Sequence, residues 1–225
     1  MDQHSGREWS VDVGRDRTTA HFEPARQGPQ GTLFVFAHGA GGHKADRGMT
    51  ALAALLHGRG IDTVRFNFVY RERGSGRMDR MPQLEECVAA VALRAREELT
   101  PRRLIIGGRS MGGRAASMLA AKGFDCSGLL LLAYPLHPAR QPERLRDAHL
   151  PRIGVPVLCV NGTRDALCRR DLMEKTLAGL SSDWTMHWLE GADHSFHVIK
   201  ASGRTDADVL SEIGDAVERW AARLR

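Results

Sequence analysis

The sequence contains no apolar run long enough to cross a membrane, and no apolar segment near its start of the kind that forms a signal peptide. Its most apolar stretch, LLLLAY at 129–134, is far shorter than the ~20 residues of a membrane-spanning helix. The first ten residues, MDQHSGREWS, are polar. We therefore expect a soluble, cytoplasmic protein without a membrane partner.

Cysteine is scarce, and CxxC spacing is absent: the chain has Cys87, Cys126, Cys159 and Cys168. Such scattered residues are typical of reduced thiols in a cytosolic protein, not of a disulfide framework or a zinc site. His194 and His197 also lack a complementary pair of ligands at metal-site spacing. We expect neither a metal nor a cofactor.

The sequence also lacks a continuous segment of basic or of acidic residues. The 32 basic and 27 acidic residues give a net charge of +5, and the basic residues are spread along the whole chain. This pattern argues against a nucleic-acid partner. It favours solvated surface arginines, with a mild preference for anionic substrates as the alternative.

Short apolar runs alternate with segments of helical periodicity over almost the whole length. The runs predict strands, of which the first two form a hairpin: 8–13, 18–23, 32–37, 63–68, 103–106, 128–132, 155–161 and 184–189. Apolar residues three or four positions apart predict helices over 49–59, 84–99, 111–122 and 171–180. A capping box of Thr205 and Asp208 begins a last helix.

Strands separated by helices form a mostly parallel sheet that is covered on both faces. Neither a repeat nor a linker is visible, so we expect one α/β domain over residues 1–225. Only about twenty residues, 134–154, lie between two of the expected strands. A lid domain normally needs more, so we expect an open site without a lid. Nothing in the pattern indicates an oligomeric state.

The stretch RLIIGGRSMGGRAA, residues 103–116, surrounds one serine with four glycines. A flexible linker is one explanation of such a cluster. However, Gly108, Ser110 and Gly112 match G-x-S-x-G between an expected strand and an expected helix. In that context the serine occupies a strained strand-to-helix turn, and the glycines are a steric requirement. We therefore predict that Ser110 is a nucleophile.

A serine hydroxyl needs a base to remove its proton, and the chain order in this fold is Ser…Asp/Glu…His. Asp165 and His194 each follow an expected parallel strand, where open α/β sheets gather their sites. Asp193 is an alternative acid, but the side chains of adjacent residues on an extended loop diverge. His197 is an alternative base that lies farther from the strand end. We therefore favour Asp165 and His194.

Acyl transfer also needs N–H donors aimed at the developing oxyanion. The residue after the nucleophile, Met111, is one candidate. The loop FAHGAGGHKAD at 36–46 follows an expected strand, and Ala40 is the candidate for the second donor. This glycine-rich loop could instead cradle a phosphate, but neither G-x-G-x-x-G nor G-x-x-x-x-G-K-[ST] is present.

With these motifs in place, the chain resembles an α/β-hydrolase. Within that fold it is similar to the small dienelactone-hydrolase-like group that includes the testis-expressed and NSL-complex-subunit type hydrolase domains. The stretches that carry the resemblance extend from about residue 32 to 200: FAHGAGG (36–42), VRFNFVYRE (64–72), GGRSMGGRAAS (107–117), LLAYPLHP (131–138), NGTRD (161–165) and DHSF (193–196).

The resemblance implies the same triad and an oxyanion loop that includes His38 and Gly39. It also suggests that the pocket mouth is lined by Tyr70, Arg71 and the segment from Tyr134 to His137. Dienelactone hydrolases proper use a cysteine nucleophile, so Ser110 argues against carrying over dienelactone cleavage itself.

Two functional hypotheses follow. The first is a serine hydrolase of small or moderately sized carboxylic esters or thioesters, with acyl transfer to an alcohol or amine as a chemical variant. In it, Arg109 either contacts an acidic group of the substrate or is an ordinary solvated or salt-bridged arginine. The second is a non-catalytic binding or scaffold protein. Degenerate members of such a fold usually lose a triad residue, and all three candidates are present here, which favours the enzyme.

Overall fold

One eight-stranded sheet runs through the protein, in the order β1-β2-β4-β3-β5-β6-β7-β8. The computed structural model describes residues 6–26 and 31–224. The neighbours from β4 to β8 are parallel, whereas β1, β2 and β4 pair antiparallel. The strands are β1 (Arg7–Val13), β2 (Asp16–Glu23), β3 (Thr32–Ala37), β4 (Ile61–Phe66), β5 (Arg103–Arg109), β6 (Gly128–Leu132), β7 (Val157–Gly162) and β8 (Trp184–Leu189).

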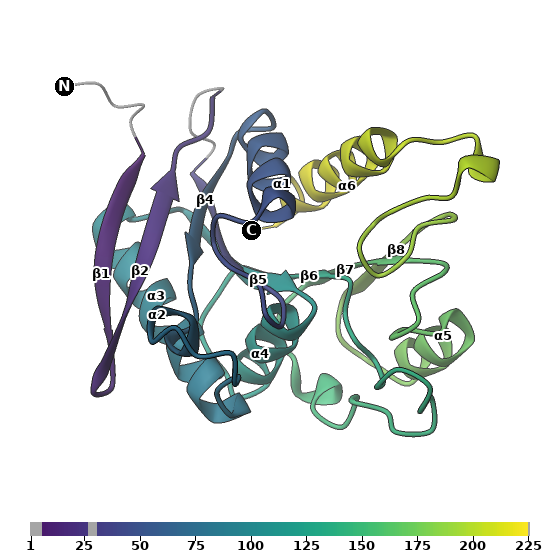
Figure 1. Cartoon of the computed structure of the whole chain (residues 1–225), viewed down its shortest axis with the longest axis horizontal. Coiled ribbons are helices and arrows are strands. Elements are labelled where there is room, and N and C mark those ends of the chain that lie inside the picture. Colours follow the sequence, from purple (N-terminus) through teal and green to yellow (C-terminus); the bar gives the residue numbers. More distant parts are fainter. Residues whose placement is uncertain (1–5, 27–30, 225) are drawn as a thin grey trace.

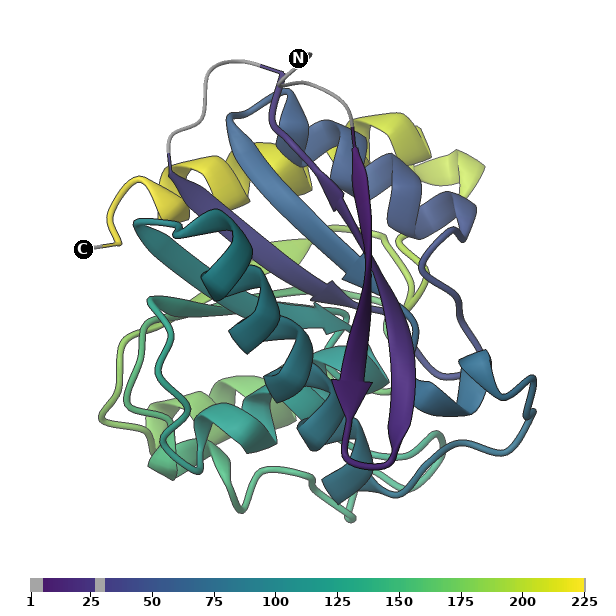
Figure 2. The same ribbon diagram turned by 90° about the vertical axis from the view of Figure 1, so that its left-hand side faces the viewer.

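Helices cover both faces of this sheet. As Figure 1 shows, α1 and α6 lie on one face, and α3, α4 and α5 lie on the other. Figure 2 shows the β1–β2 hairpin at one edge of the sheet, where β1 packs against α3. The helices are α1 (Arg47–His57), α2 (Val69–Glu72), α3 (Met81–Leu99), α4 (Met111–Ala120), α5 (Arg170–Ala178) and α6 (Asp206–Ala221), with 3₁₀ helices η1 (Leu150–Arg152) and η2 (Lys200–Ser202).

Strand β3 illustrates why the central runs are apolar at every position. All six of its residues are buried. Phe34 and Phe36 point into the core beneath α1 and α6, while Leu33 and Val35 pack on the side of α3 and α4. Side chains alternate between the two faces of a strand, so a strand covered on both sides has no polar face.

The predicted fold class and strand pattern are confirmed. The observed strands β3, β6 and β8 have the predicted bounds, and the other elements lie within a few residues of the prediction. The capping box of α6 is present: the Asp208 N–H donates to Thr205 Oγ1, and Asp208 Oδ2 accepts from the Thr205 N–H. The short helices α2, η1 and η2 were not predicted, because one turn of helix carries no periodicity.

Two of the strand ends that differ from the prediction do so for identifiable reasons. Strand β4 ends at Phe66, two residues earlier than predicted, because Phe68 already caps the N-terminus of α2. Strand β5 continues to Arg109, three residues beyond the prediction, because Gly107 and Gly108 still pair with β3 and β6. The apolar pattern ends where these glycines begin, although the hydrogen bonding of the strand does not.

The turn between β5 and α4 depends on two glycines. A Cβ added to Gly108 would lie 2.3 Å from the Ala37 carbonyl oxygen, and one on Gly112 would lie 2.5 Å from that of His38. No side chain fits at such distances, so the turn packs directly against the end of β3. Between them, Ser110 adopts φ 51° and ψ −116°, a conformation that costs energy for a non-glycine residue. This is the geometry that the motif predicts.

The connection between β6 and β7 is fully described, and its only helix is the single turn η1. It therefore adds no lid domain over the ends of the strands. No helix in the part of the chain that the structure describes is both long and apolar enough to cross a membrane.

Gly112→Ala tests the steric requirement at this turn. We expect it to lower the free energy of unfolding by roughly 1–3 kcal/mol, the usual cost of overpacking, because the new Cβ collides with the backbone at the end of β3. Urea unfolding followed by circular dichroism measures the change.

The matched control is Gly48→Ala in α1, where nothing lies within 4 Å of the added Cβ. There alanine should stabilise the helix by up to about 1 kcal/mol. Equal unfolding midpoints for Gly112→Ala and the wild-type protein would contradict the steric account.

Candidate active site

Four loops meet at the carboxyl ends of the parallel strands. They follow β3, β5, β7 and β8, and they carry Ala40, Ser110, Asp165 and His194 respectively. Parallel strands bring their carboxyl ends to one edge of the sheet, so residues far apart in the chain become neighbours there.

The structure brings Ser110, His194 and Asp165 together in one hydrogen-bonded row. Ser110 Oγ lies 2.9 Å from His194 Nε2, and His194 Nδ1 lies 2.8 Å from Asp165 Oδ2. Because a carboxylate only accepts, the Nδ1 proton points to Asp165 and leaves Nε2 free to accept the Ser110 hydroxyl proton. The protons of this row are therefore placed as a serine nucleophile requires: His194 Nε2 can accept the proton that Ser110 must lose.

Asp165 is held by two further donors. Its side chain has no solvent exposure, Oδ2 accepts from Asn161 Nδ2 at 3.1 Å, and Oδ1 accepts from the Leu167 N–H at 2.8 Å. Asn161 is in turn fixed by the backbone of Tyr134, through one accepted and one donated bond. The carboxylate therefore cannot rotate away from His194 without breaking several hydrogen bonds.

The two alternatives raised by the sequence have other partners. Asp193 Oδ1 accepts from the N–H groups of Ser195 and His197 and shapes the turn that carries His194. His197 is exposed, and its Nδ1 lies 2.6 Å from Asp206 Oδ2 at the start of α6. Neither side chain joins the hydrogen-bonded row.

Arg109 contacts the histidine loop. One terminal nitrogen donates to the His194 carbonyl oxygen at 3.3 Å and to Ser195 Oγ at 3.2 Å. Burial lowers the pKa of the Arg109 guanidinium, and the nearby carboxylates of Asp193 and Asp165 oppose that shift. Arg109 is thus partly buried against the loop and steadies the main chain at His194.

The loop after β3 packs against the serine turn. A Cβ built on Gly39 would lie 3.5 Å from Ser110 Cβ, so the loop passes directly beside the nucleophile. Met111 is the first residue of α4, where a helix leaves its N–H groups without intrahelical partners. Ala40, Ser110 and Met111 line the same cavity, so both residues expected to donate to an oxyanion lie beside the nucleophile.

The side chains of His38 and Tyr70 hydrogen-bond to the backbone of this loop. His38 is fully buried: its Nε2 accepts from the Phe68 N–H at 3.1 Å, and its Nδ1 donates to the Gly39 carbonyl at 2.7 Å. Burial lowers the pKa of His38 to about 4, so the imidazole is neutral near pH 7. The Tyr70 hydroxyl accepts from the Gly41 N–H at 3.2 Å. Neither His38 in the expected oxyanion loop nor Tyr70, expected at the pocket mouth, lines the cavity beside Ser110; both side chains hydrogen-bond to the loop after β3 instead.

A cavity of about 260 Å³ opens beside Ser110. This is slightly below the ~300–1,000 Å³ typical of sites for drug-sized ligands. Its wall mixes apolar side chains with charged ones, and it is formed by Ala40, Met78, Asp79, Met81, Leu84, Ser110, Met111, Arg114, Pro135, Arg146 and Leu167.

Three residues that were expected at the pocket mouth lie elsewhere. Tyr134 is fully buried and donates its hydroxyl proton to the Arg146 carbonyl. His137 is 2% exposed and accepts from the Arg169 N–H. Arg71 is absent from the cavity wall, and its Nε is buried without a hydrogen-bond partner among the described residues. Within the expected segment 134–137, Pro135 alone reaches the cavity wall.

Sequence reasoning missed Asn161, Arg114 and Arg146. Arg114 could have been found, because it lies four residues after Ser110 and therefore on the same face of α4. Arg146 lies in a segment without regular structure, so no sequence periodicity predicts that its side chain faces the cavity. Among residues 6–26 and 31–224, no group of three or more His, Cys, Asp or Glu side chains is arranged to hold a metal ion.

Comparison with known proteins adds a family to this geometry. A family model described as an alpha/beta hydrolase domain matches residues 30–222. Among solved structures, the chain is similar to an alpha-beta serine hydrolase homologue from Coxiella burnetii, with 20% identity over 95% of this chain and 96% of that chain and a TM-score of 0.76. It is also similar to a serine hydrolase without a lid from Xanthomonas campestris, with 20% identity, 96% and 95% coverage, and a TM-score of 0.78.

A third similar structure is a dienelactone hydrolase from Anabaena variabilis, with 18% identity, coverage of 99% of this chain and 100% of that chain, and a TM-score of 0.75. At these levels of identity the likeness is one of fold. In each of these three comparisons, the match covers nearly the full length of both chains.

His38 predicts a specific pH dependence of stability. Its folded pKa of about 4 lies below the unfolded value near 6.5, so protons favour the unfolded chain between these values. The unfolding free energy should fall by up to about 3 kcal/mol as the pH drops from 6.5 to 4 on account of this residue. His149, with a pKa of about 4, adds to the same slope.

His38→Gln removes the His38 share. Urea unfolding of both proteins between pH 4 and 7 should give a visibly shallower slope for the variant, whatever its absolute stability. An unchanged slope would contradict the buried, neutral state of His38.

Proposed function

Because this chain belongs to the alpha/beta hydrolase domain family, we propose that it is a serine hydrolase that cleaves carboxylic esters or thioesters through an acyl-enzyme on Ser110. The observation that carries the proposal is the row of hydrogen bonds from Ser110 through His194 to Asp165, with separations of 2.9 and 2.8 Å. A scaffold protein has no need to preserve this row.

In the acylation step, the Ser110 oxygen attacks the carbonyl carbon of the substrate while His194 Nε2 takes the hydroxyl proton. The carbonyl oxygen becomes an oxyanion and accepts hydrogen bonds from the Ala40 and Met111 N–H groups. Asp165 keeps the His194 proton on Nδ1 and stabilises the imidazolium that forms. The tetrahedral intermediate then collapses, and His194 returns the proton to the departing alcohol or thiol.

In the deacylation step, His194 Nε2 takes a proton from water, whose oxygen attacks the acyl carbon on Ser110. Collapse of the second intermediate releases the carboxylic acid and restores the Ser110 hydroxyl. The histidine is neutral before and after each cycle. The reaction needs no cofactor, since every proton has a donor and an acceptor among these residues.

The size of the cavity supports small or moderately sized acyl groups. About 260 Å³ beside Ser110 leaves little room for a long lipid chain, and no lid domain extends the wall. The narrower testis-expressed or NSL-complex subgroup remains a prediction from the sequence. Ser110, in place of a cysteine, argues against dienelactone cleavage.

A fluorophosphonate probe tests the proposal, since it reacts with an activated serine. The wild-type protein should form a covalent adduct whose mass maps to Ser110 by peptide mass spectrometry. The adduct should be absent in Ser110→Ala and strongly reduced in His194→Ala. The matched control is Ser181→Ala, an exposed serine in the loop before β8, which should label like the wild-type protein.

Folded wild-type protein that remains unlabelled would overturn the proposal and favour the scaffold hypothesis. Circular dichroism of each variant confirms that loss of labelling does not reflect loss of the fold.

Asp165→Asn separates the role of the carboxylate from that of the nucleophile. An amide can donate to Nδ1 and so stabilise the wrong tautomer of His194, which lowers kcat by about 10⁴-fold in such a triad. Hydrolysis of p-nitrophenyl acetate measures the loss. Asp183→Asn, an exposed carboxylate just before β8, is the control and should retain full activity; a similar rate for both variants would contradict the assigned role.

A further inference from the structure

We propose that the cavity beside Ser110 binds a carboxylate of the substrate through Arg114 and Arg146, so that the preferred substrates are small esters or thioesters that carry a free carboxylate. This inference rests on the proposed hydrolase function and adds the chemical class of its substrate.

Both arginines belong to the wall of the cavity that contains the nucleophile. Arg114 lies on α4 one turn beyond Ser110, and its N–H donates to the Ser110 carbonyl oxygen at 3.0 Å. Residues four apart on a helix share a face, so the Arg114 side chain leaves α4 on the side of the nucleophile. Arg146 approaches from the segment between β6 and β7, which closes the same cavity from another direction.

Neither guanidinium has a carboxylate partner among the described residues. The ion pairs of this part of the chain include neither Arg114 nor Arg146. The Arg114 Nε is buried and has no hydrogen-bond partner in the part of the chain that the structure describes. Within residues 6–26 and 31–224, the Arg146 side chain donates only to the Pro135 carbonyl oxygen, at 3.4 Å. Buried donors without partners cost free energy, which an anionic ligand would recover.

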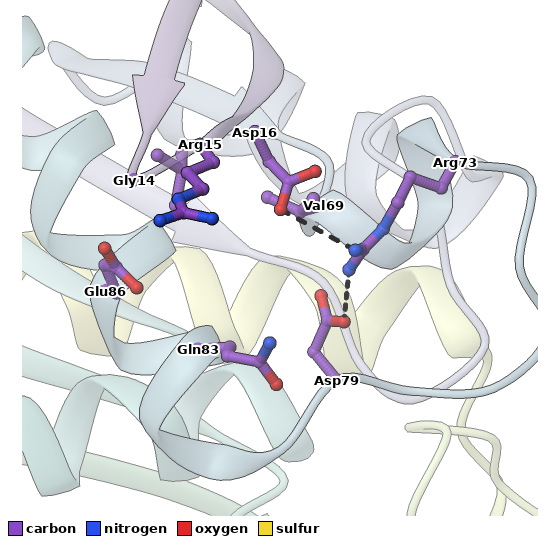
Figure 3. A pocket seen from close by; sticks show the side chains of 9 residues that line it. Gly14, Arg15, Asp16, Val69, Arg73, Asp79, Gln83 and Glu86 are labelled. Atoms are coloured by element: carbon purple, nitrogen blue, oxygen red, sulfur yellow. Dashed lines mark hydrogen bonds and ion pairs between the residues drawn. The ribbon is translucent and has the colours of Figure 1, made fainter.

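The acidic residue of the cavity wall is already neutralised. Asp79 Oδ1 accepts from Arg73 at 2.6 Å, and Oδ2 accepts from the Tyr70 N–H at 3.0 Å. Figure 3 shows Arg73 between Asp79 and Asp16, in a second, small polar pocket that Asp79 also lines. The charge of Asp79 is therefore already paired with Arg73, whereas the cavity wall also contains Arg114 and Arg146, which keeps an excess of positive charge there.

The two guanidinium groups belong to the wall of one cavity, where their positive charges oppose each other. Burial lowers the pKa of Arg146, and the positive charge of Arg114 lowers it further. Like charges gathered in a partly buried wall are unfavourable unless an anion lies between them. Arginine also presents a planar fork of donors that matches a carboxylate, which a neutral amide or alkyl group cannot reproduce.

The experiment compares ester pairs that differ only in charge. Monoethyl glutarate and ethyl glutaramate place a carboxylate or its amide on the acyl side. The esters 3-acetoxypropanoate and 3-acetoxypropanamide place the same groups on the alcohol side. We expect kcat/KM to be at least tenfold higher for the carboxylate in one of the two pairs, as charge-assisted hydrogen bonds imply. The pair that shows the preference identifies which side of the ester faces the arginines.

Variants assign the preference to these side chains. Arg146→Gln should lose about 10- to 100-fold in kcat/KM for the carboxylate ester and little for the amide, while Arg146→Lys should keep part of the preference. Arg114→Gln should act in the same direction. The matched control is Arg144→Gln, two residues before Arg146. It removes an exposed guanidinium that donates to Gln141 Oε1, and it should keep the full preference.

A second measurement does not depend on turnover. Free glutarate should slow fluorophosphonate labelling of Ser110 in the wild-type protein, glutaramide should not, and Arg146→Gln should abolish the protection. Normal labelling, with carboxylate-to-amide ratios near one in both pairs and no protection, would overturn this inference and leave the serine hydrolase standing. Absence of labelling would overturn the proposed hydrolase itself.

Discussion

The close approach of two stretches of backbone decides where the nucleophile lies. Gly108 and Gly112 pack directly against the carbonyl oxygens of Ala37 and His38, so the serine turn and the end of β3 cannot separate or slide. Ser110 is then held at a positive φ and lines the cavity. The same contact brings the loop of Ala40 beside the serine. One steric constraint thus positions the nucleophile and the expected oxyanion donors together.

Hydrogen bonds to buried groups complete the arrangement. Asp165 has no solvent exposure and is fixed by Asn161 and the Leu167 N–H, which gives the His194 ring one orientation. The neutral His38 ring accepts from the Phe68 N–H and donates to the Gly39 carbonyl, and so holds the loop after β3 in place. The site is therefore largely pre-organised, and the loops that carry it are tied to the sheet by side chains that lie outside the cavity wall.

Much of this could be predicted from the sequence, because the fold makes the order of motifs informative. Ser110, Asp165 and His194 each follow a parallel strand, and the topology alone brings such positions to one edge. The lining of the cavity could not be predicted in the same way. Tyr134 looks like a pocket residue, yet its hydroxyl is satisfied by a backbone carbonyl in the interior. Arg146 reaches the cavity from an irregular segment whose path depends on tertiary contacts.

The most direct test of the account is the position of the proton on His194, which can be measured by ¹H–¹⁵N NMR of protein labelled at its histidine nitrogens. We predict that the neutral ring carries its proton on Nδ1 and has an unprotonated Nε2, and that both signals change in Asp165→Asn. A proton on Nε2, or signals that are indifferent to Asp165, would contradict the hydrogen-bonded row on which the proposed chemistry depends.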